Sequence, residues 1–355
     1  SMNHQSQIYD HIFFFTNGAI GDFLMTLLCA DAVMGDMPES ACTIFAPRNT
    51  QVLRELCSAY PRVRVQEMSW CGFVALVPLL IKNMGKRNMV VRQGVFKEDP
   101  CSIEVLARLL SMRAESSYVR FLQQQDSARL SEKGIVFDPN LLVYENLVRL
   151  VGVAGVDIPS SVPVYRFNAP EHVLERHALL PSSYIVVHPC AFSPARSLPP
   201  SRWVSIVNTM MENNPSLKIV ITGSAYDNAF IQKILSPDFP KANVVNLAGE
   251  LSMPELAWVV SNARGYVGVD TGVTHLAGVL CKQSVVIGNL SNPCWLPRYN
   301  ENAVILTEPK NCTCDGKKGG DCFYYVGDEK YYKCLLDISD EVIVQAIQQM
   351  LAKNS

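Results

Sequence analysis

The sequence predicts an α/β protein of two domains, and three observations support this prediction. The chain has 355 residues, which is long for one domain and comfortable for two. Hydrophobic residues make up 48% and charged residues 18%, so the chain can build two cores and lacks the composition of a disordered protein. In the second half, short β-rich runs alternate with helix-like stretches of about ten residues, which is typical of βαβ units and a parallel sheet.

The first half of the chain is the less regular one. Strands are expected at residues 12–15, 43–45, 63–65 and 89–91, and an apolar helix is expected after Gly21 as far as Met34. Pro159, Pro163 and Pro170 mark residues 157–170 as the linker between the domains. We therefore place the two domains at residues 1–165 and 166–355.

The second half shows the clearer alternation. Its expected strands are residues 184–187, 217–222, 244–247, 266–269 and 284–287. Its expected helices are residues 202–212, 227–235, 254–262, 273–280 and 341–351. Because the strands are apolar along their length, we expect a parallel sheet that is buried on both faces.

Charge and cysteine usage exclude several classes of function. The formal net charge of -2 gives no electrostatic basis for binding nucleic acid, so local groups must hold any anionic ligand. The longest apolar run, residues 71–81, is too short to span a bilayer, and no segment has the order of a secretory signal. Cysteines such as Cys29, Cys71 and Cys281 lie in apolar stretches, where we expect small buried hydrophobes in a reducing compartment. A cytoplasmic protein is therefore expected.

Small and polar residues follow the strands of the second domain. Ligands of open parallel sheets bind beyond the carboxyl ends of the strands. Ser193 and Arg196 lie in the loop after the strand at 184–187, and Gly223 follows the strand at 217–222. The guanidinium of Arg196 has several donors and can clamp phosphate oxygens.

The sharpest feature is the turn Asp270-Thr271-Gly272 before the helix at 273–280, with His275 one turn into that helix. Its residues can cap the helix, and its glycine lets a ligand approach helix N–H groups that attract anions. The alternative is structural, because such a turn is often only a helix cap and a histidine there is often a core residue. Polar ends on several strands favour an anionic, nucleotide-like ligand.

Asp22 is the candidate in the first domain. It follows a strand, a glycine-containing loop and the start of a helix. Its carboxylate either stabilises the helix N-terminus or acts as a general base that faces the other domain across a cleft. The loop is not G-x-G-x-x-G, and the chain has neither a Walker A loop nor a G-x-S-x-G elbow.

These segments resemble the ADP-heptose:lipopolysaccharide heptosyltransferases, glycosyltransferase family 9. The resemblance is strong over residues 184–297, above all in GYVGVDTGVTHLAGVL (265–280) and the later Asn292-Pro293. Ile20-Gly21-Asp22, residues 246–256 and the segment that begins at Cys334 also fit, whereas residues 38–162 show little resemblance.

The resemblance implies a GT-B fold, with two Rossmann-like domains facing each other across a cleft. The first domain would bind the acceptor, and Asp22 matches the catalytic base of the family. The second would bind the nucleotide sugar, and Arg196 stands where the family has a basic residue, usually lysine, at the diphosphate. The residues expected at this donor site are Ser193, Arg196, Gly223, Asp270, Thr271, Gly272 and His275.

The implied function is inverting transfer of heptose from ADP-heptose to a bacterial glycan such as lipopolysaccharide core. Asp22 would remove the proton of the acceptor hydroxyl, and Arg196 would stabilise the leaving diphosphate, so no cofactor is required for catalysis. A lipid-linked acceptor is compatible with a peripheral contact with the inner membrane. The alternatives are a nucleotide-sugar-binding protein without transferase activity, and a GT-B enzyme with another donor or a protein acceptor.

Four late cysteines, Cys312, Cys314, Cys322 and Cys334, lie in the Gly- and Lys-rich segment 312–334. Four thiolates can hold tetrahedral zinc or iron, and such a closed site is structural rather than catalytic. The resemblance adds support, because heptosyltransferases that modify autotransporter proteins carry an iron-binding cysteine finger. The alternative is four thiols on a loop of a cytosolic protein.

Overall fold

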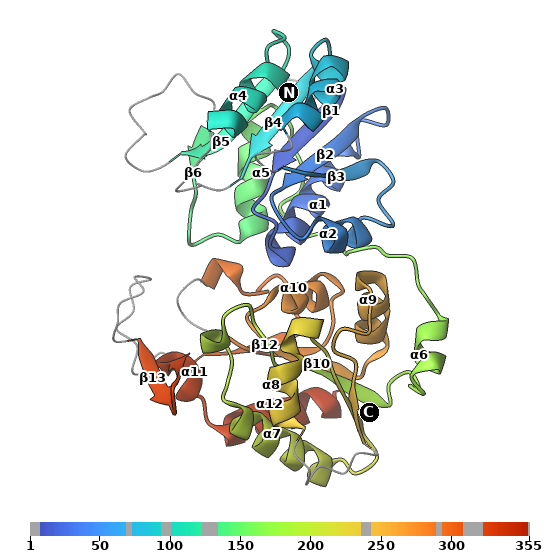
Figure 1. Ribbon diagram of the computed structural model, residues 1–355, viewed down its shortest axis with the longest axis vertical. Coiled ribbons are helices and arrows are strands. Elements are labelled where there is room, and N and C mark those ends of the chain that lie inside the picture. Colours follow the sequence, from blue (N-terminus) through green and yellow to red (C-terminus); the bar gives the residue numbers. More distant parts are fainter. Residues whose placement is uncertain are drawn as a thin grey trace, which may run out of the picture. The chain divides into compact units, whose positions relative to one another are not determined.

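The computed structural model describes residues 8–68, 73–93, 101–122, 134–235, 243–288, 293–307 and 322–353. The chain divides into two compact units, Ser1–Phe167 and Asn168–Ser355. Each unit contains one six-stranded parallel sheet with helices packed on it (Figure 1). The predicted α/β class is therefore confirmed.

The first unit contains more elements than the sequence predicted. Its strands are β1 (His11–Phe15), β2 (Ala41–Ala46), β3 (Val63–Glu67), β4 (Asn88–Arg92), β5 (Ser117–Leu122) and β6 (Gly134–Val136). Its helices are α1 (Ile20–Met34), α2 (Thr50–Leu56), α3 (Phe73–Asn83), α4 (Cys101–Leu110) and α5 (Val143–Val153). The four expected strands and the expected helix are confirmed, whereas β5, β6 and the helices α2 to α5 were not predicted.

The second unit follows the predicted alternation. Its sheet contains β7 (Tyr184–His188), β8 (Lys218–Ile221), β9 (Val244–Asn246), β10 (Gly265–Val269), β11 (Ser284–Ile287) and β12 (Ala303–Leu306). The helices are α6 (His172–Arg176), α7 (Pro200–Asn213), α8 (Asn228–Ile234), α9 (Met253–Asn262), α10 (Gly272–Val279), α11 (Lys333–Leu336) and α12 (Asp340–Ala352). Short 3-10 turns are η3 (Pro194–Arg196), η4 (Ala225–Asp227) and η5 (Pro293–Trp295), and β13 (Phe323–Val326) pairs with β14 (Glu329–Tyr332) as a hairpin.

Both sheets have the same topology. The strand orders are β3-β2-β1-β4-β5-β6 and β12-β11-β10-β7-β8-β9, and all neighbours are parallel. In each sheet the chain runs outward from a central strand and then returns to the other side of that strand. The crossovers on either side of this switch point diverge, which opens a crevice where ligands of such sheets bind. The switch points lie between β1 and β4 and between β7 and β10.

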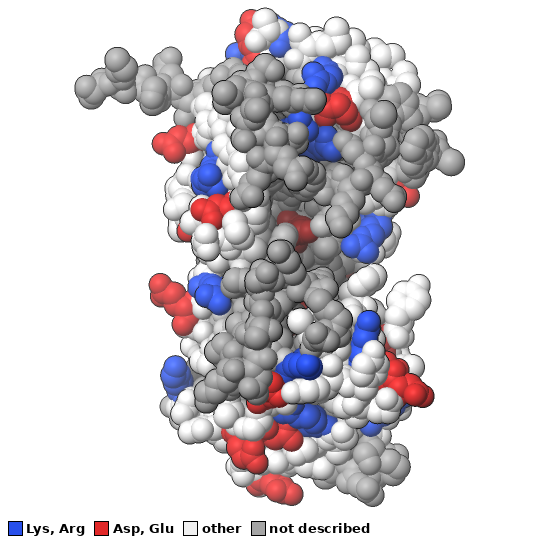
Figure 2. Space-filling model, turned by 90° about the vertical axis from the view of Figure 1, so that its left-hand side faces the viewer, with Lys and Arg blue, Asp and Glu red and all other residues white. Residues whose placement is uncertain are grey.

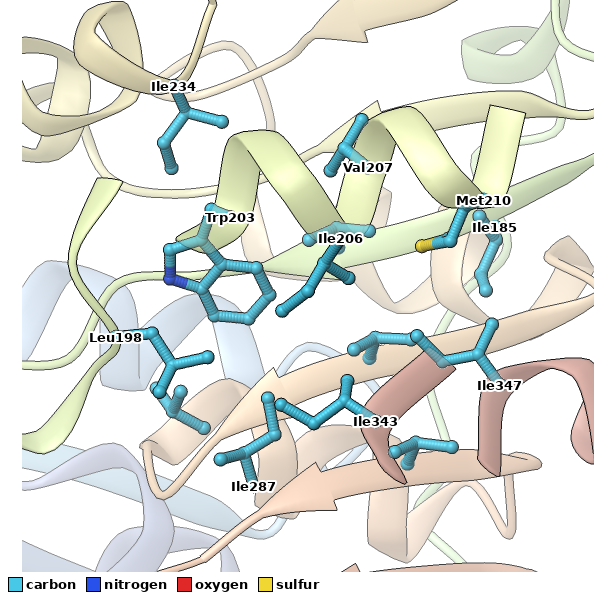
Figure 3. Packing of buried hydrophobic residues seen from close by; sticks show 14 of the residues in the cluster. Ile185, Leu198, Trp203, Ile206, Val207, Met210, Ile234, Ile287, Ile343 and Ile347 are labelled. Carbon is cyan, nitrogen blue, oxygen red and sulfur yellow. The ribbon is translucent and has the colours of Figure 1, made fainter. Parts of the chain in front are cut away.

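One large hydrophobic cluster forms the core of the second unit. The apolar residues of α7 recur with the helical period and form one buried face, which packs on the sheet and on α12 (Figure 3). Trp203 fills the centre of this cluster and is fully buried. Removing a buried tryptophan side chain costs about 3–5 kcal/mol. The labelled members are Ile185, Leu198, Trp203, Ile206, Val207, Met210, Ile234, Ile287, Ile343 and Ile347.

One expectation about the cysteines is wrong. Cys281 is exposed, whereas Cys29 is buried as expected and Cys71 lies outside the described residues. Cys281 has a φ of 54°, in the left-handed region, and the N–H of Lys282 donates to the carbonyl oxygen of Ala277. This turn ends α10, and it leaves the Cys281 side chain at the surface.

The surface agrees with the small net charge. On the face that Figure 2 shows, the described Lys and Arg side chains are interspersed with Asp and Glu, without an extended patch of one sign. Among the helices that the structure describes, none has the length and hydropathy needed to cross a membrane.

Candidate functional site

Side-chain hydrogen bonds join the end of β10 to the first turn of α10. The hydroxyl of Tyr266 donates to Thr274 Oγ1 at 2.8 Å, and the hydroxyl of Thr274 donates to the carbonyl oxygen of Val269 at 2.5 Å. A Cβ atom at Gly268 would clash with the hydroxyl of Tyr266, two residues earlier on the same strand, so the glycine leaves the space that this hydroxyl occupies. These contacts fix the first turn of α10 relative to the end of β10.

The β10 turn, Asp270-Thr271-Gly272, leads directly into the first turn of α10. Thr271 is the N-cap residue of α10, in extended backbone conformation and without a capping bond from its side chain. The first amides of a helix have no partner within the helix, and they carry a partial positive charge. The turn thus offers an anion a set of converging N–H donors.

Asp270, Arg196 and His275 share one electrostatic neighbourhood. Burial raises the pKa of Asp270, while the charges of His275 and Arg196 act to lower it. Arg196 is the last residue of η3, and its N–H donates to the carbonyl oxygen of Ser193 at 3.0 Å. The structure therefore brings the loop after β7 and the β10 turn together at the switch point.

The loop after β7 is held by side chains rather than by regular structure. The hydroxyl of Ser197 donates to the carbonyl oxygen of Pro189, and it accepts from Trp203 Nε1 at 3.1 Å. Because Trp203 is anchored in the core, this bond fixes the loop that carries Ser193 and Arg196. Ser193 and Arg196 are both half-buried, in the loop that follows the carboxyl end of β7.

Gly223 lies one strand further from the switch point than Arg196. Its carbonyl oxygen accepts from the N–H of Gly249 at 2.9 Å, which joins the loops after β8 and β9. His188, at the end of β7, is buried, and its Nδ1 lies 2.9 Å from Thr222 Oγ1. Burial lowers the pKa of His188 to about 4, so this histidine is a neutral core residue.

His275 is 6% exposed and is engaged by residues that sequence reasoning missed. Its Nδ1 lies 3.0 Å from Tyr299 Oη, and the backbone of Trp295 hydrogen-bonds its ring. These partners lie in the segment between β11 and β12. The β7–β10 site comprises the β10 turn, Ser193, Arg196 and His275.

Asp22 lies in the first turn of α1, beside the switch point of the first unit. Asn17 Nδ2 donates to Asp22 Oδ2 at 2.5 Å, and Asn17 Oδ1 accepts from the N–H of Ala19 at 2.9 Å. Gly18 has a φ of 84°, and a Cβ atom there would lie 2.8 Å from Arg48 Cγ. The glycine thus allows the tight loop that orients the carboxylate of Asp22.

The second oxygen of Asp22 is buried and has no hydrogen-bond partner within the described part of the chain. Burial raises the pKa of Asp22 to about 6, although the Asn17 bond and the Arg48 charge act to lower it. A carboxylate with this pKa is ionised at neutral pH and binds a proton more readily than an ordinary aspartate.

Two further side chains at the same switch point each have a polar atom without a partner among the described residues. Gln93 follows β4, its N–H donates to the carbonyl oxygen of Phe15 at 3.1 Å, and its Oε1 lies 2.7 Å from Thr26 Oγ1. Gln93 Nε2 and Thr16 Oγ1 are buried and unpaired among the residues described. Buried polar atoms are normally satisfied, so this β1–β4 site (Thr16, Asp22 and Gln93) is suited to a ligand rich in hydroxyls.

Two of the four late cysteines can be placed. Cys322 precedes β13 and Cys334 follows β14, and the N–H of Lys333 donates to the carbonyl oxygen of Cys322 at 2.9 Å. Both therefore lie at the open end of one hairpin. Cys312 and Cys314 lie outside the described residues, and within the described ranges no three His, Cys, Asp or Glu side chains form a metal-binding group.

Comparisons with known proteins agree on one family. The family model described as glycosyltransferase family 9 (heptosyltransferase) matches residues 119–321. Lipooligosaccharide heptosyltransferase 2 of Haemophilus ducreyi is 24% identical over 165 residues, which are 45% of this chain and 45% of that protein. The chain thus spans about half the length of the curated relatives that it matches.

Two solved structures show the fold. The ADP-heptose lipopolysaccharide heptosyltransferase II of E. coli has a TM-score of 0.71 at 19% identity, over 97% of this chain and 99% of that one. An E. coli heptosyltransferase solved with ADP-2-deoxy-2-fluoro heptose has a TM-score of 0.65 at 15% identity, over 96% and 99% of the chains. These likenesses confirm the predicted GT-B class of two Rossmann-like domains.

Proposed function

The chain belongs to glycosyltransferase family 9, the heptosyltransferases, and from this premise we propose that it is an inverting glycosyltransferase. It moves heptose from ADP-heptose to a hydroxyl of a bacterial glycan such as lipopolysaccharide core. The observation that carries this proposal is the unpaired, buried oxygen of Asp22, whose raised pKa suits a general base.

The donor binds at the β7–β10 site. Its diphosphate lies against the amides of Gly272 and the next residues of α10, with the guanidinium of Arg196 beside it. Ser193, in the loop after β7, and Gly223, in the loop after β8, lie beside the nucleotide. Two observations support this assignment. The charge of Arg196 acts on the carboxyl of Asp270, and a solved structure of similar fold contains an ADP-linked heptose analogue.

The reaction is a single displacement. Asp22 Oδ1 takes the proton of the acceptor hydroxyl as the hydroxyl oxygen attacks the anomeric carbon, and the bond from that carbon to the diphosphate oxygen breaks on the opposite face. The electron pair of the broken bond leaves with ADP, whose charge Arg196 and the α10 amides stabilise. Because those groups supply the positive charge, we propose that no cofactor takes part in the displacement.

The acceptor binds at the β1–β4 site. Asp22 Oδ1 accepts a hydrogen bond, Gln93 Nε2 donates one, and Thr16 Oγ1 does either, which suits neighbouring hydroxyls of a sugar ring. If the acceptor is lipid-linked, the enzyme works in the cytoplasm at the surface of the inner membrane. Co-sedimentation with anionic vesicles, with and without an acceptor glycolipid, tests that contact.

A transferase assay tests the proposal. The protein is incubated with ADP-heptose, with other nucleotide-diphosphate sugars, or with buffer, and with lipopolysaccharide that lacks core heptose. We expect release of ADP and a product of inverted anomeric configuration with ADP-heptose. ADP binding without transfer or donor hydrolysis would favour the alternative of a binding protein, and transfer from another donor would replace the heptose assignment. Transfer to a polypeptide instead would replace the glycan acceptor.

We also propose that Cys312, Cys314, Cys322 and Cys334 hold a structural zinc or iron ion. The support is the hairpin that brings Cys322 and Cys334 to the same end, together with a thiolate set that suits either metal. Metal analysis of protein purified without added metal should find about one ion per chain, as a four-thiolate site binds one. Cys322→Ser should lower that content and the unfolding temperature while leaving ADP affinity unchanged.

A further inference from the structure

We propose that the ring of Tyr226 stacks on the base of the donor nucleotide, beside the β7–β10 site. Tyr226 lies in the short turn η4, in the loop that follows β8. The inference rests on the proposed function for the class of ligand, a nucleoside diphosphate sugar. It adds a contact to the base, whereas Arg196 and the α10 amides contact the diphosphate.

The side chain of Tyr226 is 97% exposed, more than any other large hydrophobic side chain in the described ranges. Tyrosine rings in folded proteins are usually partly covered, because most of their surface is apolar. An aromatic ring that stands almost wholly in solvent, close to a ligand site, has both faces available for stacking on a flat group. Nucleotide bases are flat groups of this kind, and every base has a π-face that an aromatic side chain can cover.

The turn η4 holds this ring in a fixed position. The N–H and Oγ of Ser224 both donate to Asp227 Oδ2, at 2.6 and 2.8 Å, and the N–H of Asp227 donates to the carbonyl oxygen of Ser224 at 3.1 Å. These bonds close a capping box around the turn. Because the backbone is already ordered, stacking on a ligand restricts only the rotation of the Tyr226 side chain.

Small residues surround the turn. The N–H of Gly249 donates to the carbonyl oxygen of Gly223 at 2.9 Å, so the loops after β8 and β9 lie together. Gly249 has a φ of 77°, and a Cβ atom there would lie 3.0 Å from Ala225 Cα. The glycine therefore allows the close approach of the two loops, and backbone rather than side chains forms the surface where they meet. This surface leaves room for a flat group beside Tyr226.

The base of a bound donor can reach these loops from the diphosphate position. On the β11 side of the β10 turn, the segment 295–300 packs on α10. Tyr299 Oη lies 3.0 Å from His275 Nδ1, and a Cβ atom at Gly278 would lie 2.8 Å from the same hydroxyl. β8 is the neighbour of β7 on the side away from β10, and its loop carries the small residues described above. We therefore place the base over the loops after β8 and β9, against the ring of Tyr226.

Calorimetry with ADP and with inorganic pyrophosphate separates the base from the diphosphate. Tyr226→Ala should weaken ADP binding about 5- to 150-fold, which corresponds to about 1–3 kcal/mol for one aromatic–base stack. Pyrophosphate has no base, so its affinity should be the same for the variant and the wild type. Unchanged ADP affinity would overturn the proposal. An equal loss for ADP and pyrophosphate would also overturn it, because the ring would then act on the diphosphate or on the shape of the loop.

Two further substitutions test whether the ring itself makes the contact. Tyr226→Phe keeps the ring and removes the hydroxyl, so it should recover most of the ADP affinity that Tyr226→Ala loses. A loss as large as that of the alanine variant would show a hydrogen bond from the hydroxyl in place of stacking. Tyr226→Trp introduces an indole, whose fluorescence ADP should quench beyond any change seen in the wild type. Absence of this additional quenching would contradict stacking.

Tyr325→Ala is the matched control, because Tyr325 is a 71% exposed tyrosine in β13 of the same unit. We expect its ADP affinity to equal that of the wild type, and a loss like that of Tyr226→Ala would overturn the proposal. The proposed function can fail separately. A protein that binds ADP through Tyr226 but transfers no sugar would keep this inference and lose the transferase assignment. Normal transfer by the wild type, with unchanged ADP affinity in Tyr226→Ala, would do the reverse.

Discussion

The β1–β4 site and the β7–β10 site occupy the same place in two sheets of the same strand order, yet their chemistry is opposite. The first presents a carboxylate, Asp22, whose second oxygen has no hydrogen-bond partner among the described residues and whose pKa burial raises to about 6. The second presents a guanidinium and helix amides, and its own carboxylate, Asp270, lies next to positive charge. The same topology therefore carries a buried carboxylate in one unit and a guanidinium near a helix N-terminus in the other.

The difference comes from how each helix begins. α1 starts after a loop in which Gly18 and Asn17 direct the side chain of Asp22, so a negative group occupies the helix N-terminus. Neither helix has a capping bond from the side chain of its N-cap residue, and the first turn of α10 contains no acidic side chain, whereas that of α1 contains Asp22. The fold supplies two equivalent crevices, and a few loop residues decide what each can do.

The sharpest way to break the comparison is Asp22→Asn. This substitution keeps the shape of the side chain and removes its ability to take a proton. We expect kcat to fall about 10²- to 10⁴-fold, the usual contribution of a general base, with ADP affinity unchanged. Single-turnover transfer measured beside ADP calorimetry checks both parts, and a variant that retains near-normal turnover would remove Asp22 from the base role.

The sequence predicted the second unit better than the first because of how its strands are built. β11 (Ser284–Ile287) ends in three consecutive apolar residues, and all four of its residues are buried. β5 alternates buried and half-buried positions and includes Ser117 and Arg120, while β6 has three half-buried residues, so neither stands out by hydrophobicity. Strands of this kind are recognised by their neighbours in the sheet, which a single sequence does not reveal.

The same distinction holds for the sites. Asp22 and the β10 turn could be found because a strand, a turn and a helix start are local patterns. Gln93 and Tyr299 could not, because Gln93 meets Thr26 across 67 positions and Tyr299 meets His275 across 24. Both residues reach their sites only through contacts with residues far away in the sequence. The roles of the sequence-derived residues stay predictions until the variants described here are measured.

Arg196 gives the next largest expected effect, now on the second site. Arg196→Met removes the charge beside the leaving diphosphate, and we expect kcat to fall about 10²- to 10³-fold, as for loss of one charge-stabilising donor. Arg196→Lys should recover most of that loss, because it restores the charge without the planar fork. Steady-state kinetics with both variants measures this, and equal activity of the methionine and lysine variants would contradict it.

The pH dependence separates the two sites. Since the pKa of Asp22 lies at about 6, the fraction of ionised base falls below that pH, and kcat/KM should drop about tenfold at pH 5. ADP affinity should change much less over this range.

The effect of Asp22 on folding stability has the opposite dependence on pH. Its pKa is higher in the folded protein than in the unfolded chain, so folding disfavours the ionised carboxylate. The free energy of unfolding therefore falls as pH rises from 3.8 to about 6. Asp22→Asn should therefore gain relative stability toward neutral pH, which urea unfolding at pH 4 and 7 measures.

The smallest expected effect concerns Gln93. It tests whether residues other than Asp22 bind the acceptor at the β1–β4 site. Gln93→Met removes both the Thr26 bond and the unpaired Nε2, whereas Thr26→Val removes only the bond. If Nε2 donates to an acceptor hydroxyl, Gln93→Met should raise the acceptor KM about 2- to 13-fold above the value for Thr26→Val. Donor KM should be equal in the two variants. Matching acceptor KM values would confine Gln93 to packing and leave Asp22 as the functional group of that crevice.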